Sequence, residues 1–155
     1  MTHEAYCAQW LRLRENEVFV SIGDAELERF LNPSFERDRK LGATMGLPDL
    51  LSKYQREQET FFRIREVKFK LEQRLVVKAL TQLKSGIRQL NLVLDAPQID
   101  RVEIVVPLHG RKIKKNELAF LGEEISPGRF ELNWKNGFAD WELEFSFCPV
   151  TILAI

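Results

Sequence analysis

The chain has 155 residues, of which 45% are hydrophobic, 10% aromatic and 30% charged. This composition predicts a single folded domain over residues 1–155 and excludes a disordered chain, because there are enough apolar side chains to form a core. No run approaches the roughly 20 apolar residues that span a bilayer, and no basic and apolar leader opens the chain, so we expect a cytoplasmic protein without membrane segments.

Cysteine and histidine are sparse. Cys7 and Cys148 lie far apart, and so do His3 and His109, with no ligand spacing in either pair. This excludes a disulfide scaffold and a cysteine-rich metal site, and it argues against a histidine-rich zinc site. We expect both cysteines to be small, buried apolar residues in a reducing compartment.

The net charge is zero only as a sum over three unequal parts. Residues 1–60 carry 8 Lys/Arg and 11 Asp/Glu, residues 61–115 carry 13 and 5, and residues 116–155 carry 2 and 7. The balances are therefore −3, +8 and −5. A basic middle section could present a positive face to a polyanion, or it could be a solvated helix face with internal ion pairs.

The first half of the chain predicts short elements that lead into a hairpin. In order, they are a helix from Thr2 to Leu13, a strand over Val18–Ile22, a helix over Ala25–Leu31, a short helical turn from Ser34 to Leu41, a strand through Ser52-Lys-Tyr54, a polar connection over Gln55–Glu59 and a strand over Thr60–Leu71. The last of these is rich in aromatic and β-branched residues and contains no breaker, which is typical of a strand.

The second half predicts a long amphipathic helix followed by strands. In order, they are a helix from Glu72 to Leu94, a central strand over Arg101–Pro107, a basic loop over Gly110–Lys115, a hairpin of Phe130–Trp134 and Trp141–Phe147 around Asn136-Gly137, and a terminal strand within Phe145–Ile155. Apolar residues at three- and four-residue spacing indicate the helix, and the Asn-Gly pair indicates the hairpin turn. The order of elements predicts a mixed α/β fold.

Two carboxylates and a lysine gather around the first predicted hairpin. Pro48-Asp49 stands before one strand, and Glu66-Val67-Lys68 lies in the next, where alternation places Glu66 and Lys68 on one face. Pairing of the strands could bring Asp49 beside Glu66. Carboxylate oxygens suit Mg²⁺, and the lysine ammonium would position or help to deprotonate a water and offset transition-state charge.

These motifs resemble the PD-(D/E)XK nuclease superfamily over about residues 24–107. The family pattern is an acid at or after a proline, then acid-x-Lys on an adjacent strand, and many members carry Gln-Leu in the following helix, as Gln82-Leu83 does here. The resemblance implies a restriction-endonuclease-like mixed sheet flanked by helices, with a β-rich C-terminal extension at about 116–155.

The resemblance also implies a role for each matching residue. It assigns Mg²⁺ or Mn²⁺ ligation to Asp49, Glu66 and the Val67 carbonyl, the catalytic lysine to Lys68 and support of the site or substrate contact to Gln82. A further acid on the first core helix would be Glu26 or Glu28. The tyrosine that often follows the glutamine by four residues is replaced by Gly86, and a second acid-x-Lys triplet, Asp38-Arg-Lys40, lies in a polar stretch with no predicted strand.

Basic residues near this motif predict contact with phosphates. The candidates for nucleic-acid binding are Lys70, Arg74, Lys78, Lys84 and Arg88, with Arg111-Lys-Ile-Lys-Lys115 as a second anchor. Such contacts bind nucleic acid without reading its sequence. Trp134 and Trp141 could stack on bases, although packing in a core or an interface explains them better.

The sequence therefore predicts a Mg²⁺-dependent nuclease that hydrolyses DNA phosphodiester bonds with metal-activated water. Cleavage of both strands would need two sites, so a homodimer or a partner nuclease is expected. One alternative is a non-catalytic nuclease-fold subunit that binds nucleic acid or a protein in a larger complex, and another is a β-rich interaction domain with an acidic partner. For the motif itself, the alternative is a surface Glu–Lys pair across strands, with Asp49 as a turn residue.

Overall fold

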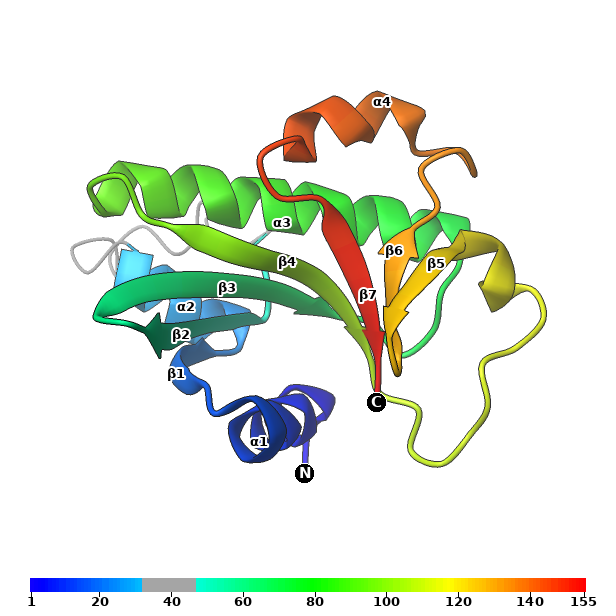
Figure 1. Cartoon of the computed structure of the whole chain (residues 1–155), viewed down its shortest axis with the longest axis horizontal. Helices are drawn as coiled ribbons and strands as arrows, with labels where there is room; N and C mark the ends of the chain where they lie inside the picture. Colours follow the sequence, from blue (N-terminus) through cyan, green and yellow to red (C-terminus); the bar gives the residue numbers. More distant parts are fainter. Residues whose placement is uncertain (32–46) are drawn as a thin grey trace.

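A mixed seven-stranded sheet forms the centre of the molecule (Figure 1). The computed structural model describes residues 1–31 and 47–155. The helices are α1 (His3–Glu15), α2 (Asp24–Leu31), α3 (Gln73–Val93), η2 (Glu117–Phe120), α4 (Ala139–Glu142) and η3 (Leu143–Phe145). The strands are β1 (Val18–Ile22), β2 (Leu50–Arg56), β3 (Glu59–Val67), β4 (Ile99–Val106), β5 (Leu121–Ser126), β6 (Arg129–Leu132) and β7 (Val150–Ala154).

The strand order is β1-β2-β3-β4-β7-β6-β5, which places β4 in the middle of the sheet. β1, β2 and β3 pair antiparallel, β3 and β4 pair parallel, β4 and β7 pair parallel, and β7, β6 and β5 pair antiparallel. The strands of the C-terminal section thus continue the sheet that β1–β4 begin. The structure confirms an α/β class with a mixed sheet flanked by helices.

Helices cover both faces of the sheet. On one face α1 packs through Cys7, Ala8 and Leu11 against β2, β4 and β7. On the other face α2 and α3 bury their apolar stripes, together with aromatic residues from the segment that contains α4 and η3. No helix of residues 1–31 and 47–155 is long and apolar enough to cross a membrane.

The predicted helices and strands of the first two thirds match the observed ones closely. The prediction for β4 as a central strand is confirmed, and the helix predicted from Glu72 to Leu94 is observed as α3, Gln73–Val93. The strand predicted to reach Leu71 ends at Val67. The Lys68 N–H still donates to the Val105 carbonyl, but beyond it the Leu71 N–H donates to Glu117 and the Phe69 carbonyl accepts from Arg111, so the backbone leaves the sheet. The turn from Ser34 to Leu41 and the Asp38-Arg-Lys40 triplet lie outside the described residues.

The predicted hairpin around Asn136-Gly137 is wrong. The C-terminal hairpin is formed instead by β5 and β6, and residues 133–147 form turns and the short helices α4 and η3. Four aromatic residues of this segment pack against the core at helical rather than strand spacing: Trp134, Phe138, Trp141 and Phe145. The spacing of three and four residues therefore outweighs the turn preference of the Asn-Gly pair.

Pro48 packs against α3 at Gly86, and this contact fixes the residue that follows Pro48. A Cβ atom at Gly86 would lie 2.6 Å from Cγ and Cδ of Pro48. The Asp49 backbone is held as well, since its carbonyl accepts from the Gly23 N–H at 2.6 Å. A larger residue at position 86, such as the tyrosine of the family pattern, would displace Pro48 and therefore Asp49.

We expect Gly86→Ala to destabilise the protein. Alanine gains about 1 kcal/mol of helix propensity, but the rigid proline ring cannot move aside, so overpacking should cost about 1–3 kcal/mol and shift Asp49. Urea denaturation of the variant and of Thr81→Ala, on the exposed face of the same helix, measures the difference. Equal or greater stability of Gly86→Ala would show that Pro48 does not constrain this position.

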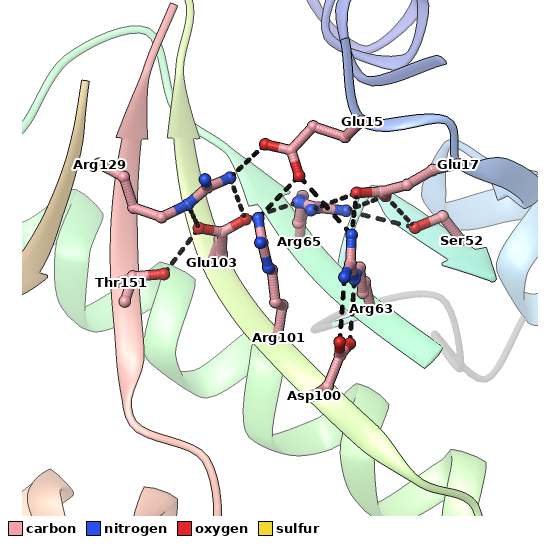
Figure 2. Close-up of polar contacts among 10 residues, drawn as sticks. All are labelled: Glu15, Glu17, Ser52, Arg63, Arg65, Asp100, Arg101, Glu103, Arg129 and Thr151. Carbon is pink, nitrogen blue, oxygen red and sulfur yellow. Dashed lines mark hydrogen bonds and ion pairs between the residues drawn. The ribbon is translucent and has the colours of Figure 1, made fainter. Parts of the chain in front are cut away.

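The α1 face carries a buried network of ion pairs (Figure 2). It contains four arginines and four carboxylates, with two hydroxyl groups: Arg63, Arg65, Arg101, Arg129, Glu15, Glu17, Asp100, Glu103, Ser52 and Thr151. Arg65 is fully buried between Glu17 at 2.6 Å and Glu103 at 3.0 Å. The network balances its own charge and joins the end of α1 to strands β2, β3, β4, β6 and β7.

Acid should weaken this network through Glu103. Burial alone would raise the pKa of Glu103. The opposite effect of Arg65, Arg129 and Thr151 is larger, so the pKa is lowered to about 2. A carboxyl group whose pKa is lowered by folding stabilises the protein at pH values above its unfolded pKa of about 4.5. This stabilisation is lost as the pH falls from about 4.5 toward 2. Glu103→Gln should therefore lower the free energy of unfolding at pH 7 by about 3–5 kcal/mol, because it leaves Arg65 and Arg129 without this carboxylate, and should flatten the dependence below pH 5.

Chemical denaturation from pH 7 to pH 2 measures both effects. Glu124→Gln is the control, because Glu124 is exposed and makes no ion pair within residues 1–31 and 47–155. A Glu103→Gln variant as stable as the wild type at pH 7 would contradict a stabilising role for the network.

Candidate functional site

The sequence-predicted residues converge where β2 begins and β3 ends. Asp49 immediately precedes β2, Glu66 lies near the end of β3, and Lys68 follows β3. Because β2 and β3 are antiparallel, these ends are adjacent, and Leu50 pairs with Arg65 in the register. Gln82 comes from α3, which covers this face of the sheet.

Asp49 and Glu66 are held to each other through backbone and side chain. The Asp49 N–H donates to Glu66 Oε1 at 3.0 Å, and the Val67 N–H donates to Asp49 Oδ2 at 3.0 Å. The two carboxyl groups also interact electrostatically, since the charge of Asp49 raises the pKa of Glu66. The strand pairing therefore brings together two acids that are 17 residues apart.

Lys68 and Gln82 complete the cluster. Lys68 Nζ lies 2.9 Å from Glu66 Oε2 and donates to Gln82 Oε1 at 3.1 Å. Gln82 in turn donates through Nε2 to the Leu47 carbonyl at 3.3 Å, so its amide is oriented from both ends. The side chains of Glu66 and Lys68 are 2% and 11% exposed. This pair is largely buried and joins the end of β3 to the residue that follows it, unlike the surface cross-strand pair considered as an alternative.

Burial dominates the electrostatics of the two acids. Desolvation raises the pKa of Glu66, and the charge of Asp49 and the hydrogen bond to it raise it further, to about 9, against the opposing effect of Lys68. Desolvation also raises the pKa of Asp49. At neutral pH the pair therefore shares a proton. A carboxyl with a strongly perturbed pKa beside a lysine is a common property of functional sites.

The donor set fits a hard divalent cation with several remaining waters. Asp49 and Glu66 offer carboxylate oxygens, which Mg²⁺ and Mn²⁺ prefer, and Mg²⁺ is commonly held by one or two carboxylates with water and substrate phosphate. Within residues 1–31 and 47–155, no three His, Cys, Asp or Glu side chains form a group that could hold a metal ion. The protein would thus supply two carboxylates, together with the Val67 carbonyl that the family pattern implies, and leave the other positions to water and substrate.

Sequence reasoning missed one acid near this site. The charge of Glu4, on α1, raises the pKa of Asp49. Glu26 and Glu28, the two predicted upstream acids, lie on α2, where Glu26 is exposed and Glu28 is 2% exposed. Glu4 precedes buried Ala8 and Leu11 by four and seven residues, so an acid on the apolar stripe of α1 was the signal that could have identified it.

The predicted phosphate-binding residues of α3 divide into two groups. Arg74 and Lys78 precede Gln82 by eight and four residues, so they lie on the helix stripe that leads to the site. Lys84 is paired with Glu144 at 3.1 Å and lies with Arg88 beside η3. Lys70 and Arg74 each approach the carboxylate of Glu72 to 3.2 Å.

The basic loop after β4 is fastened next to the site by Glu117. This buried carboxylate accepts hydrogen bonds from the N–H groups of Leu71 and Lys114 and pairs with Arg111 at 2.7 Å. Arg111 also donates to the Phe69 carbonyl. Lys112, Lys114 and Lys115 remain exposed and make no ion pair with any part of the chain that the structure describes. Their charges are available to a partner.

The two cysteines and two tryptophans have structural positions. Cys7 and Cys148 are buried and unpaired, as predicted, and burial raises their pKa values to about 12 and about 11. Trp134 and Trp141 pack against the core, and Trp134 stacks on Phe145. These packing contacts agree with the preferred explanation of both tryptophans.

Comparison of the chain with protein-family models, with curated proteins and with solved structures found no match.

The free energy of unfolding of the metal-free protein should depend on pH through the proton that Glu66 holds. An acid with a raised pKa binds a proton in the folded state that the unfolded chain releases, so this group lowers stability as the pH rises from about 4.5 to about 9. Glu66→Gln keeps a neutral side chain at every pH and should be more stable than the wild type at pH 8 by roughly 2 kcal/mol, but not at pH 4.

Thermal denaturation in chelator at several pH values measures this difference. Glu59→Gln, at the exposed other end of β3, is the matched control and should follow the wild type. A Glu66→Gln variant that loses stability at pH 8 would show that ionised Glu66 is paired favourably in the fold.

Proposed function

We propose that the protein is a Mg²⁺- or Mn²⁺-dependent nuclease of restriction-endonuclease-like fold that hydrolyses DNA phosphodiester bonds. The observation that carries the proposal is the convergence of Asp49, Glu66, Lys68 and Gln82, from the ends of two paired strands and one helix, into one hydrogen-bonded cluster.

The residues have distinct tasks in this proposal. Asp49 and Glu66 would hold the cation, which supplies Lewis-acid stabilisation of phosphate charge when it is bound. Lys68, oriented by Gln82, is placed to direct a water toward the phosphate or to compensate negative charge as the bond breaks. Binding of the cation requires Glu66 to give up its proton, which frees both carboxylates to act as ligands.

Substrate would lie over the strand ends that carry the cluster, next to Lys68. Lys112, Lys114 and Lys115 in the loop fastened by Glu117, and Lys78 on the stripe of Gln82, supply positive charge around it. Such contacts fix the position of a phosphate backbone without reading its sequence. The loop lysines therefore take precedence over Lys84, whose charge is paired with Glu144.

Cleavage assays test the proposal. Labelled single-stranded, duplex and plasmid DNA are incubated with Mg²⁺ or Mn²⁺, and chelator should abolish cleavage. Lys68→Met should reduce the rate by about 10²-fold or more, since it removes the positioned cation at the reacting phosphate. Lys135→Met removes one exposed charge elsewhere and should leave the rate unchanged.

Two results would contradict the proposal. Cleavage that survives in Lys68→Met and in Asp49→Asn would place the activity elsewhere or in a contaminant. Salt-dependent DNA binding without cleavage by the wild type would favour the non-catalytic nuclease-fold subunit. The observation in favour of that alternative is the ion pair between Lys68 and Glu66 at 2.9 Å, because the two groups already satisfy each other without a metal ion or a substrate.

A further inference from the structure

A large cavity lies away from the candidate site, between the α4–η3 segment and the strands beneath it. Its volume is about 780 Å³, and its walls include Ile125 of β5, Trp134, Leu143 and Phe145. None of the four residues of the candidate site lines it. A concave, mostly apolar cavity of this volume is large enough to take several side chains of a ligand.

The charge of this cavity is entirely acidic. Asp100, Glu131 and Glu142 line it, and no lysine or arginine of residues 1–31 and 47–155 does. Asp100 is neutralised by Arg63 at 3.0 Å, whereas Glu131 and Glu142 make no ion pair with the described residues. The cavity therefore combines an apolar surface with two uncompensated carboxylates, which attract a cation and repel phosphate.

Large apolar side chains around the cavity are exposed to solvent. Ile125 and Leu143 are 56% and 81% exposed, although both line the cavity. Apolar side chains grouped at the surface are typical of contact with another protein.

We propose that this cavity binds a segment of a partner protein that inserts an apolar side chain and places arginine or lysine beside it. The apolar side chain contacts Trp134, Leu143 and Phe145, and its basic neighbours pair with Glu131 and Glu142. Complementarity of charge selects a basic segment, and the proposal is independent of nuclease activity.

Fluorescence polarisation with three labelled peptides tests the chemistry of the partner. The first alternates arginine with leucine and phenylalanine, the second replaces each arginine by glutamate, and the third replaces leucine and phenylalanine by alanine. The first peptide should bind saturably, and both replacements should weaken binding by about tenfold or more. Affinity for the first peptide should fall as salt rises from about 50 to about 300 mM.

Variants locate the binding surface. The double variant Glu131→Gln/Glu142→Gln should weaken binding by about fivefold or more, and so should Leu143→Ser, since all three residues are exposed and their replacement spares the core. The matched control is Glu123→Gln/Glu124→Gln, which makes the same change of charge on exposed residues of β5 outside the cavity walls. Its affinity should remain within about twofold of the wild type.

Three outcomes would overturn the proposal. These are no binding of the basic apolar peptide, equal binding of all three peptides, or equal loss in the control and the cavity variants. Sedimentation equilibrium tests whether a second copy of this chain occupies the cavity. If the protein binds no peptide but forms a dimer that Leu143→Ser dissociates, the cavity binds a second copy instead.

Discussion

The buried ion pairs between α1 and the sheet are the interaction on which the rest of the structure depends (Figure 2). An arginine such as Arg65 cannot be buried without carboxylates around it, because an unpaired charge in the interior costs several kcal/mol. Glu17 and Glu103 satisfy it from two directions, and Arg129 shares Glu103. These requirements fix the end of α1 over the sheet and thereby also the position of Glu4 in the first turn of the same helix.

The two faces of β3 show opposite electrostatic conditions. Arg63 and Arg65 point into the network, whereas Glu66 points toward α3 and meets one lysine and one further acid. Glu103, with two arginines, has its pKa lowered to about 2, while that of Glu66 is raised to about 9. A fold that satisfies its buried charges on one face leaves an acid under-compensated on the other. That contrast, more than the motif itself, favours a chemical role for the second face.

Short-range patterns predicted much of the fold, and short-range motifs predicted that Asp49 lies beside Glu66. The apolar spacing of α3 and the strand composition of β3 are local properties, and pairing of neighbouring strands brings Asp49 to Glu66 without any distant contact. The features missed were of two kinds. Some depend on tertiary packing that overrides a turn preference, as at Asn136-Gly137. Others join residues far apart, such as His3 Nδ1 and His109 Nε2 at 3.1 Å, or Arg129 and Glu15.

The pair of Arg129 and Glu15 has a consequence for the synthesis of the chain. Its atoms are 2.6 Å apart, but its residues are separated by 114 positions. During translation α1 emerges before its arginine partner on β6 has been made, and β7, which completes the sheet, follows β6. Since contacts between residues so far apart in the sequence form slowly, α1 should dock only after β6 and β7 have been made. Until then, the incomplete sheet would expose an unpaired β4 edge to other nascent chains.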